Sequence, residues 1–340
     1  MFRVLIVWLF LHTTLVVFAS HVMGGEITYK HLGAGNYQFE LVFYRDCNGA
    51  DVNAVSENLR VWNHPSLSVI PVLFVQRQDL SPSCTQVPGG ASPLLCGTGN
   101  NGGNGIGAIE KVIYRSAPIA LSGTPPAQGW AFTYENFSRS GALTNLSNPS
   151  TYGITLVAKI FNLAQPDDSP IFNEDPNFVS CAGLPYQYNA AVSDANLDSL
   201  HFEFGVPYDH FPVGSYNPPS NPAPIPFVSG FSAASPTPGT SVNASNIPAV
   251  LNPLNGNLTF TSFTIGNYVV KIVVKAYRGG LLISETEREM QLVLQPCNSS
   301  NFPPIIAPPF AGGTSYELTV NAGDLIDYPL LITDPDTQIN

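Results

Sequence analysis

Apolar and polar residues alternate along most of this chain, and the pattern has a period of two residues. In one such run, Tyr37, Phe39, Leu41 and Phe43 fall on one face and polar residues stand between them. This alternation predicts a half-buried β-strand. The turn sequence HLGAGN precedes the run and joins it to the segment EITYK, so we expect a β-hairpin at the start of the chain.

Similar runs recur, and turn residues bound each of them. The runs that we expect to be strands are NLRVW, SVIPVLFV, EKVIYRS, GWAFTYE, YGITLVAKIF, NYVVKIVVKAY and EMQLVL. No window of a dozen residues has a convincing helical period, and the 29 glycines and 31 prolines suit many short strands joined by tight turns. The sequence therefore predicts an all-β fold built from β-sandwich domains.

The N-terminus predicts export. Residues 4–18 are nearly all apolar and follow the single positive charge of Arg3, and compact residues lead up to Ala19, after which we expect a signal peptidase to cleave. The alternative is a membrane anchor, but a spanning helix needs about 20 apolar residues. We therefore expect residues 1–19 to be a cleaved signal peptide, and no later stretch is long and apolar enough to span a bilayer.

The mature chain divides into blocks. We expect a first β-sandwich domain over 20–165 and a second over 166–297, with a proline-rich excursion at about 214–240. A proline-rich linker would follow over 298–310, and residues 311–340 would begin a truncated third sandwich repeat. Since a lone hairpin cannot bury a core, we expect this chain to be the N-terminal fragment of a larger one.

The charge balance narrows the class of partner. The chain has 13 Lys and Arg against 24 Asp and Glu, a formal net charge of −11. Too few cations are present to neutralise a phosphate backbone, which excludes nucleic acid as a partner. An acidic surface is compatible with divalent cations or simply with solubility.

Two segments carry a specific resemblance. Residues 20–49 read SHVMGGEITYKHLGAGNYQFELVFYRDCNG, and residues 266–294 read GNYVVKIVVKAYRGGLLISETEREMQLVL. Both resemble the N-terminal region of very large secreted surface proteins of the Bacteroidetes, which are adhesin-like chains of the gliding-motility-associated type. The resemblance implies tandem immunoglobulin-like, cadherin-like and polycystic-kidney-disease-like repeats, and export by the type IX secretion system.

The match to that family is uneven along the chain. Residues 288–291, Arg-Glu-Met-Gln, stand where the family tends to have Arg-Asp-x-Gln. Family members often carry a Cys-Cys-Arg-Asn run where this chain has Phe-Ser-Arg-Ser at 137–140. The resemblance therefore implies that one family disulfide is missing here.

Five cysteines in an exported chain predict disulfides with one thiol left over. Cys84 and Cys96 flank a short loop that could close on itself, and Cys181 and Cys297 bracket the second block. We expect the pairs Cys84–Cys96 and Cys181–Cys297, with Cys47 as the free thiol. A zinc site is the rival interpretation, but it needs closely spaced thiolates or histidines, which this sequence lacks.

Two clusters of oxygen-bearing side chains are candidate calcium sites. Asp194, Asn196 and Asp198 stand at alternate positions, and Asp334 and Asp336 repeat the spacing in the third block, where cadherin-like repeats carry ligands. Such spacing lets one turn present several hard ligands to Ca²⁺. The alternative is a turn in which Asp and Asn cap their own backbone without any ion. Calcium is the one cofactor that the sequence suggests.

A mixed cluster of ionisable residues is the candidate for chemistry. His201 and Glu203 share one strand face, and Asp209 and His210 lie across a turn from them. A metal or hydrolase site is conceivable, but a polar strand face and turn explain these residues as well. Neither a Gly-x-Ser-x-Gly elbow nor a His-Glu-x-x-His motif accompanies them, so we expect no enzyme.

Two functions of different classes are open at this point. The first is a non-catalytic secreted or cell-surface structural protein for adhesion, whose partner is a surface polysaccharide or a protein. The second is a set of accessory β-sandwich modules of a secreted hydrolase, acting on polysaccharide or peptide, whose catalytic domain would lie beyond residue 340. We favour adhesion because the leader, the all-β pattern and the resemblance all agree with it.

Overall fold

The computed structural model describes residues 22–81, 95–97, 99, 102–104, 107–137, 139–162, 165–297, 304–310, 312–321 and 323–333. Over these residues every regular element is a β-strand apart from one short 3-10 helix, which confirms the expected all-β class. The expected signal peptide, Cys84, Asp334 and Asp336 lie outside the described residues. Within the described part, no helix is long and apolar enough to cross a membrane.

The strands and the single 3-10 helix are named in chain order. They are β1 (Val22–Gly33), β2 (Asn36–Asp46), β3 (Ser56–Trp62), β4 (Val69–Asp79), β5 (Ile109–Ser116), β6 (Ile119–Ala120), β7 (Trp130–Asn136), η1 (Pro149–Thr151), β8 (Ile154–Ile160), β9 (Val179–Cys181), β10 (Pro185–Tyr188), β11 (Ser199–Phe204), β12 (Ile247–Leu251), β13 (Leu258–Thr261), β14 (Gly266–Arg278), β15 (Leu281–Gln295), β16 (Ile305–Ile306) and β17 (Ile332–Thr333).

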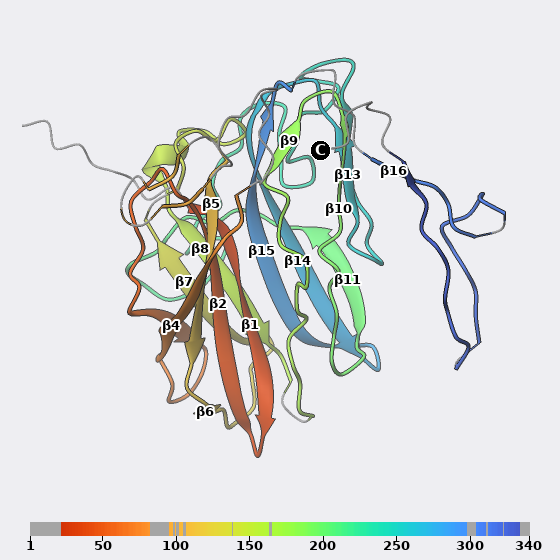
Figure 1. Cartoon of the computed structure of the whole chain (residues 1–340). Helices are drawn as coiled ribbons and strands as arrows, with labels where there is room; N and C mark the ends of the chain where they lie inside the picture. The colour runs from red at the N-terminus through yellow and green to blue at the C-terminus, as the bar shows by residue number, and fades with distance from the viewer. Residues whose placement is uncertain are drawn as a thin grey trace, which may run out of the picture. The chain divides into compact units, whose positions relative to one another are not determined.

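Eight of these strands close into a ring. The pairings run β1-β2-β5-β4-β3-β7-β8-β15, and β15 then pairs with β1 to complete the circle. From β15 the same sheet continues outward through β14 to β11, and β10, β13 and β12 form a separate three-stranded sheet. Figure 1 shows β1, β2, β4, β5, β7 and β8 gathered on one side of β15, with β14 and β11 on the other.

The long strand β15 joins the two parts of this sheet. One of its edges pairs with β14 along almost the whole length of both strands. Its other edge pairs in succession with β8 at 284–286, with β1 at 288–290 and with β9 at 293–295. The last strand of the compact unit therefore holds its first strand in place.

The glycine pair near the start of β1 is required by this crossing. At Gly24, which has φ +138°, an added Cβ would lie 1.9 Å from the carbonyl oxygen of Glu289 in β15. At Gly25, an added Cβ would lie 2.4 Å from the carbonyl oxygen of Val42 in β2. Because β1 passes so close to both neighbours, only glycine fits at these two positions.

Two main hydrophobic cores stabilise the unit. The first fills the ring and is rich in aromatic side chains, among which Phe39 and Phe132 have ring centroids 4.4 Å apart. The second lies outside the ring and packs the outer faces of β2 and β5 against β14, β15 and the three-stranded sheet. It includes Val42, Tyr44, Ile113, Tyr186, Phe260, Ile272, Met290 and Leu292.

The expected division at residue 165 does not separate two units. The described residues through Gln295 form one compact unit, and residues from Pro296 form another. The reason is that β15, from the second block, completes the ring of the first, and that the second core takes side chains from both blocks. Local periodicity cannot reveal pairings of this range.

The proline-rich excursion packs against other parts of the compact unit. Ile225, 1% exposed, packs with Leu143, Leu146 and Val269 in a third small core. The Asn145 side chain is fully buried and donates to the carbonyl oxygens of Pro236, at 2.8 Å, and of Val269, at 2.9 Å. The excursion is thus held by an amide as well as by apolar contacts.

The described residues between 304 and 333 contain one short ladder, in which β16 pairs with β17 in antiparallel fashion. Most of their large apolar side chains are exposed; Leu325, for example, is 91% exposed. This segment has no core of its own among the described residues. That agrees with the expectation that two strands cannot bury one.

Candidate functional site

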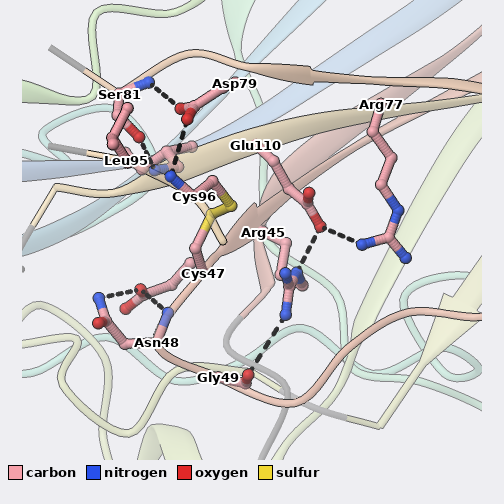
Figure 2. The surroundings of a disulfide bond; sticks show 12 residues. Arg45, Cys47, Asn48, Gly49, Arg77, Asp79, Ser81, Leu95, Cys96 and Glu110 are labelled. Carbon is pink, nitrogen blue, oxygen red and sulfur yellow. Dashed lines mark hydrogen bonds and ion pairs between the residues drawn. A yellow bond between two sulfur atoms is a disulfide. The ribbon is translucent and has the colours of Figure 1, made fainter. Parts of the chain in front are cut away.

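The disulfide in the first block is Cys47–Cys96, so the expected Cys84–Cys96 bridge and free Cys47 are wrong. Cys47 is fully buried just after β2, and its Cα lies 5.4 Å from that of Cys96. Gly103 and Ala108 lie beside the end of β2. The Cys47 N–H donates to the Ala108 carbonyl and the Gly103 N–H donates to the Cys47 carbonyl, both at 2.9 Å. Figure 2 shows this disulfide and its surroundings.

The bridge closes a longer loop than the one expected. The two cysteines are 49 residues apart in sequence. In the chain-entropy model, a loop of that length contributes about 4 kcal/mol of stability. The short separation in sequence favoured Cys84 as the partner of Cys96, whereas the structure pairs Cys96 with Cys47.

Cys181 and Cys297 are both disulfide-bonded as well. The ladder between β9 and β15 places Cys181 opposite Gln295, two residues before Cys297. This register is compatible with the expected Cys181–Cys297 pair, which stays a prediction.

A charge network lies beside the Cys47–Cys96 bridge (Figure 2). The fully buried Arg45 donates through Nε to Glu110 at 2.7 Å. Arg77 contacts the same carboxylate at 3.2 Å and Asp51 at 2.7 Å. Two guanidinium groups and two carboxylates therefore neutralise one another near the ends of β2 and β4 and the start of β5.

The two sulfur atoms and a Glu110 oxygen lie within 4.8 Å of one another, a distance that would suit metal ligands. Sulfur binds metal as a thiolate, however, and these two sulfur atoms are joined to each other. Glu110 is held by two arginines. In its oxidised form this group is a structural cross-link.

The expected calcium cluster forms a tight turn before β11. The Asp194 Oδ1 atom accepts from the backbone N–H of Asn196 at 2.9 Å and of Asp198 at 3.0 Å. Between them Leu197 has φ +62°, which places it in the left-handed region. The turn is therefore stabilised by its own side chains, as in the alternative that capping predicts.

Sequence spacing missed two members of this cluster. The fully buried Asp167, from the segment after β8, accepts from the Tyr29 hydroxyl at 3.2 Å. Burial, together with the hydrogen bond and charge of Asp198, raises the pKa of Asp167 to about 7. The second missed member is Arg278, the last residue of β14, which donates to both Asp167 and Asp198. We refer to Asp167, Asp194, Asn196, Asp198 and Arg278 as the Arg278 cluster.

The mixed group of histidines and acids has structural partners. Glu203 pairs across the strands with Lys275 at 2.6 Å, and His201 is exposed beside it on β11. Asp209 instead caps the start of β8, because its Oδ1 accepts from the Gly153 N–H at 2.6 Å and from the His210 N–H at 2.7 Å. The two acids thus serve different strands.

A row of buried ion pairs lies on one face of β15, and sequence analysis did not identify it. Glu285, Glu287 and Glu289 alternate along the strand and are all buried. Their partners are Lys159 at 2.5 Å, Lys271 at 2.6 Å and Arg139 at 2.5 Å, respectively. The signal that could have revealed it is the alternation of charges in ETEREMQ, which leads into the predicted strand EMQLVL.

The opposite face of β15 holds a further buried pair. Arg288 donates to the Glu26 carboxylate at 3.0 and 2.6 Å, and so connects β15 to β1. Its remaining nitrogen donates to the Tyr188 hydroxyl and to the Glu174 carbonyl, each at 2.6 Å. The guanidinium also lies 4.2 Å from the centre of the Phe172 ring.

Comparison with known proteins gives no relative: no family model, no curated protein and no solved structure matches this chain.

Proposed function

We propose that this chain is a non-catalytic structural protein of the cell surface or the secreted medium, and that it serves adhesion. The observation that carries the proposal is that acids in its charged clusters form ion pairs with arginines and lysines of the same chain. Glu110, Asp198 and Glu289 each bond to an arginine, which lies 65, 80 and 150 residues away in the sequence, respectively. Glu287 pairs with Lys271 on the neighbouring strand. Side chains used in this way fix strands in position.

The arrangement of the strands supports a mechanical role. β1 and β15 pair directly, and the Glu26–Arg288 ion pair lies at that pairing. A load applied at both ends of the compact unit would act on hydrogen bonds and a buried ion pair together. Disulfides fit an oxidising compartment outside the cytosol, in agreement with the expected signal peptide.

The test combines location, binding and activity. Antibodies against the full chain are expected to label intact cells that produce it, and deletion of its gene is expected to reduce the attachment of those cells to polysaccharide-coated or protein-coated surfaces. The purified chain, added back, should compete for attachment and should release neither reducing sugars nor peptides from those coatings. Unlabelled cells, unchanged attachment or release of product would each contradict the proposal.

A further inference from the structure

The Arg278 cluster has the acid spacing of a calcium turn, but its oxygens are already bonded to a cation. We infer that the Arg278 guanidinium takes the place of a calcium ion, so that the contact between the segments that meet at the Arg278 cluster is stable without calcium. We call this contact the joint. The inference does not depend on adhesion, because it concerns how three segments of the chain are held together.

Oxygen atoms of two chain segments accept from the Arg278 guanidinium. Its Nε donates to Asp198 Oδ1 at 2.6 Å, and its Nη2 donates to Asp198 Oδ2 at 2.7 Å and to Asp167 Oδ1 at 2.8 Å. Its Nη1 donates to the Gln165 side chain at 3.3 Å and to the Pro166 carbonyl at 3.2 Å. A guanidinium has five N–H donors, and five oxygen atoms surround this one.

The oxygen atoms that calcium would need already accept hydrogen bonds. Ca²⁺ takes six to eight oxygen ligands at about 2.3–2.6 Å. Both oxygens of Asp198 accept from Arg278, and Asp194 Oδ1 caps the turn. The Asn196 Oδ1 atom accepts from the Asp168 N–H at 2.7 Å. Calcium could enter only by displacing these bonds, so the residues present do not fit the ion.

The acids of the Arg278 cluster outnumber its one arginine. Three carboxylates, those of Asp167, Asp194 and Asp198, share the single positive charge of Arg278. The raised pKa of Asp167 agrees with an excess of negative charge that one guanidinium does not fully offset. The Asp194 Oδ2 atom is buried and has no hydrogen-bond partner among the described residues. Without Arg278 this group would be strongly anionic and would attract a divalent cation.

The joint connects parts of the chain that are far apart in sequence. Arg278 ends β14, Asp167 follows β8, and Asp198 precedes β11. The sequence separations between Arg278 and these two acids are 111 and 80 residues. Calcium ions in extracellular modules hold distant segments in this way, but their affinity of about 10⁻⁴–10⁻³ M makes such a joint depend on the medium. An arginine removes that dependence.

The test is thermal unfolding of the full chain in millimolar calcium and in chelator. The wild type is expected to melt at the same temperature in both. Arg278→Gln is expected to melt several degrees lower in chelator and to recover a large part of that loss in calcium, by mass action. The triple variant Arg278→Gln/Asp194→Asn/Asp198→Asn should show no recovery.

Arg115→Gln is the matched control, because it removes an arginine that pairs with Glu40 at 2.6 Å but is 45% exposed. It should show little loss and no calcium response. A wild-type melting temperature that rises with calcium would overturn the inference, and so would an Arg278→Gln variant that calcium does not stabilise. Should that variant fail to fold, calorimetric titration of the wild type with calcium decides, since saturable binding that Asp194→Asn/Asp198→Asn abolishes would overturn it.

Discussion

Replacing Arg288 by methionine removes one partner of the ion pair that joins the first and last strands of the compact unit. The Arg288 side chain is 0% exposed and that of Glu26 is 3% exposed. Methionine retains much of the volume but none of the donors, so the Glu26 carboxylate stays buried without its cation. Breaking a buried pair in this way costs about 3–5 kcal/mol.

Further losses add to that figure. The Tyr188 hydroxyl and the Glu174 carbonyl each lose a donor at 2.6 Å, and the contact with the Phe172 ring disappears. We therefore expect the upper part of the range, about 5 kcal/mol. At about 2 °C per kcal/mol for a large domain, the melting temperature should fall by about 10 °C.

The assay is reversible unfolding by heat or urea at neutral pH, with Arg115→Met as the matched control. Arg115 also pairs with a glutamate on a neighbouring strand, but it is 45% exposed, so its loss should cost about 0–1 kcal/mol. The double variant Glu26→Gln/Arg288→Met should recover part of the stability, since it buries no charge. If Arg288→Met lost no more than Arg115→Met, the argument that β15 holds β1 through this pair would be refuted.

Three other predictions can be checked on the same chain. Gly24→Ala should prevent folding or cost more than about 4 kcal/mol, because its Cβ would lie 1.9 Å from a β15 carbonyl oxygen, whereas Gly141→Ala, whose Cβ meets only a side chain at 3.3 Å, should be tolerated in the same melting assay. Non-reducing peptide mapping should recover Cys47 linked to Cys96, and the double serine variant should lose about 4 kcal/mol; a Cys84–Cys96 peptide would contradict the structure. Asp167→Asn should flatten the pH dependence of stability between about pH 4 and 7. The pKa of Asp167 is raised to about 7 in the folded state, so the folded protein binds the extra proton and wild-type stability should fall as pH rises through this window. Identical pH profiles for Asp167→Asn and the wild type would contradict that assignment.

Local patterns in the sequence sufficed for the hairpins. The alternation before and after HLGAGN predicted the pairing of β1 with β2, and the structure places Ile27 opposite Leu41 and Tyr29 opposite Phe39. The turn at Gly279 and Gly280 likewise joins β14 to β15, which contain the two predicted strand segments NYVVKIVVKAY and EMQLVL. Both cases depend on neighbours in sequence, where period and turn chemistry specify the register.

Contacts between distant segments could not be predicted in the same way. Glu26 and Arg288 are 262 residues apart, and no periodicity relates them. The disulfide prediction was wrong for the same reason. Cys84 is closer to Cys96 in sequence, but the structure places Cys47, at the end of β2, next to Cys96. The sequence contains the glycine pair at 24–25, but it does not show why glycine is needed there. The reason is the close approach of β15 to Gly24 and of β2 to Gly25.

The Arg278 cluster shows most clearly that local spacing does not identify a distant partner. Alternating oxygen ligands on a turn have the same spacing whether a metal ion or a guanidinium neutralises them, because both are cations that need several oxygens at short range. The identity of the cation is decided by β14, which ends 80 residues after Asp198 and places Arg278 against both of its oxygens. The motif of two acids and an amide at Asp194, Asn196 and Asp198 is therefore compatible with either cation, and only the fold reveals that Arg278 is the one present.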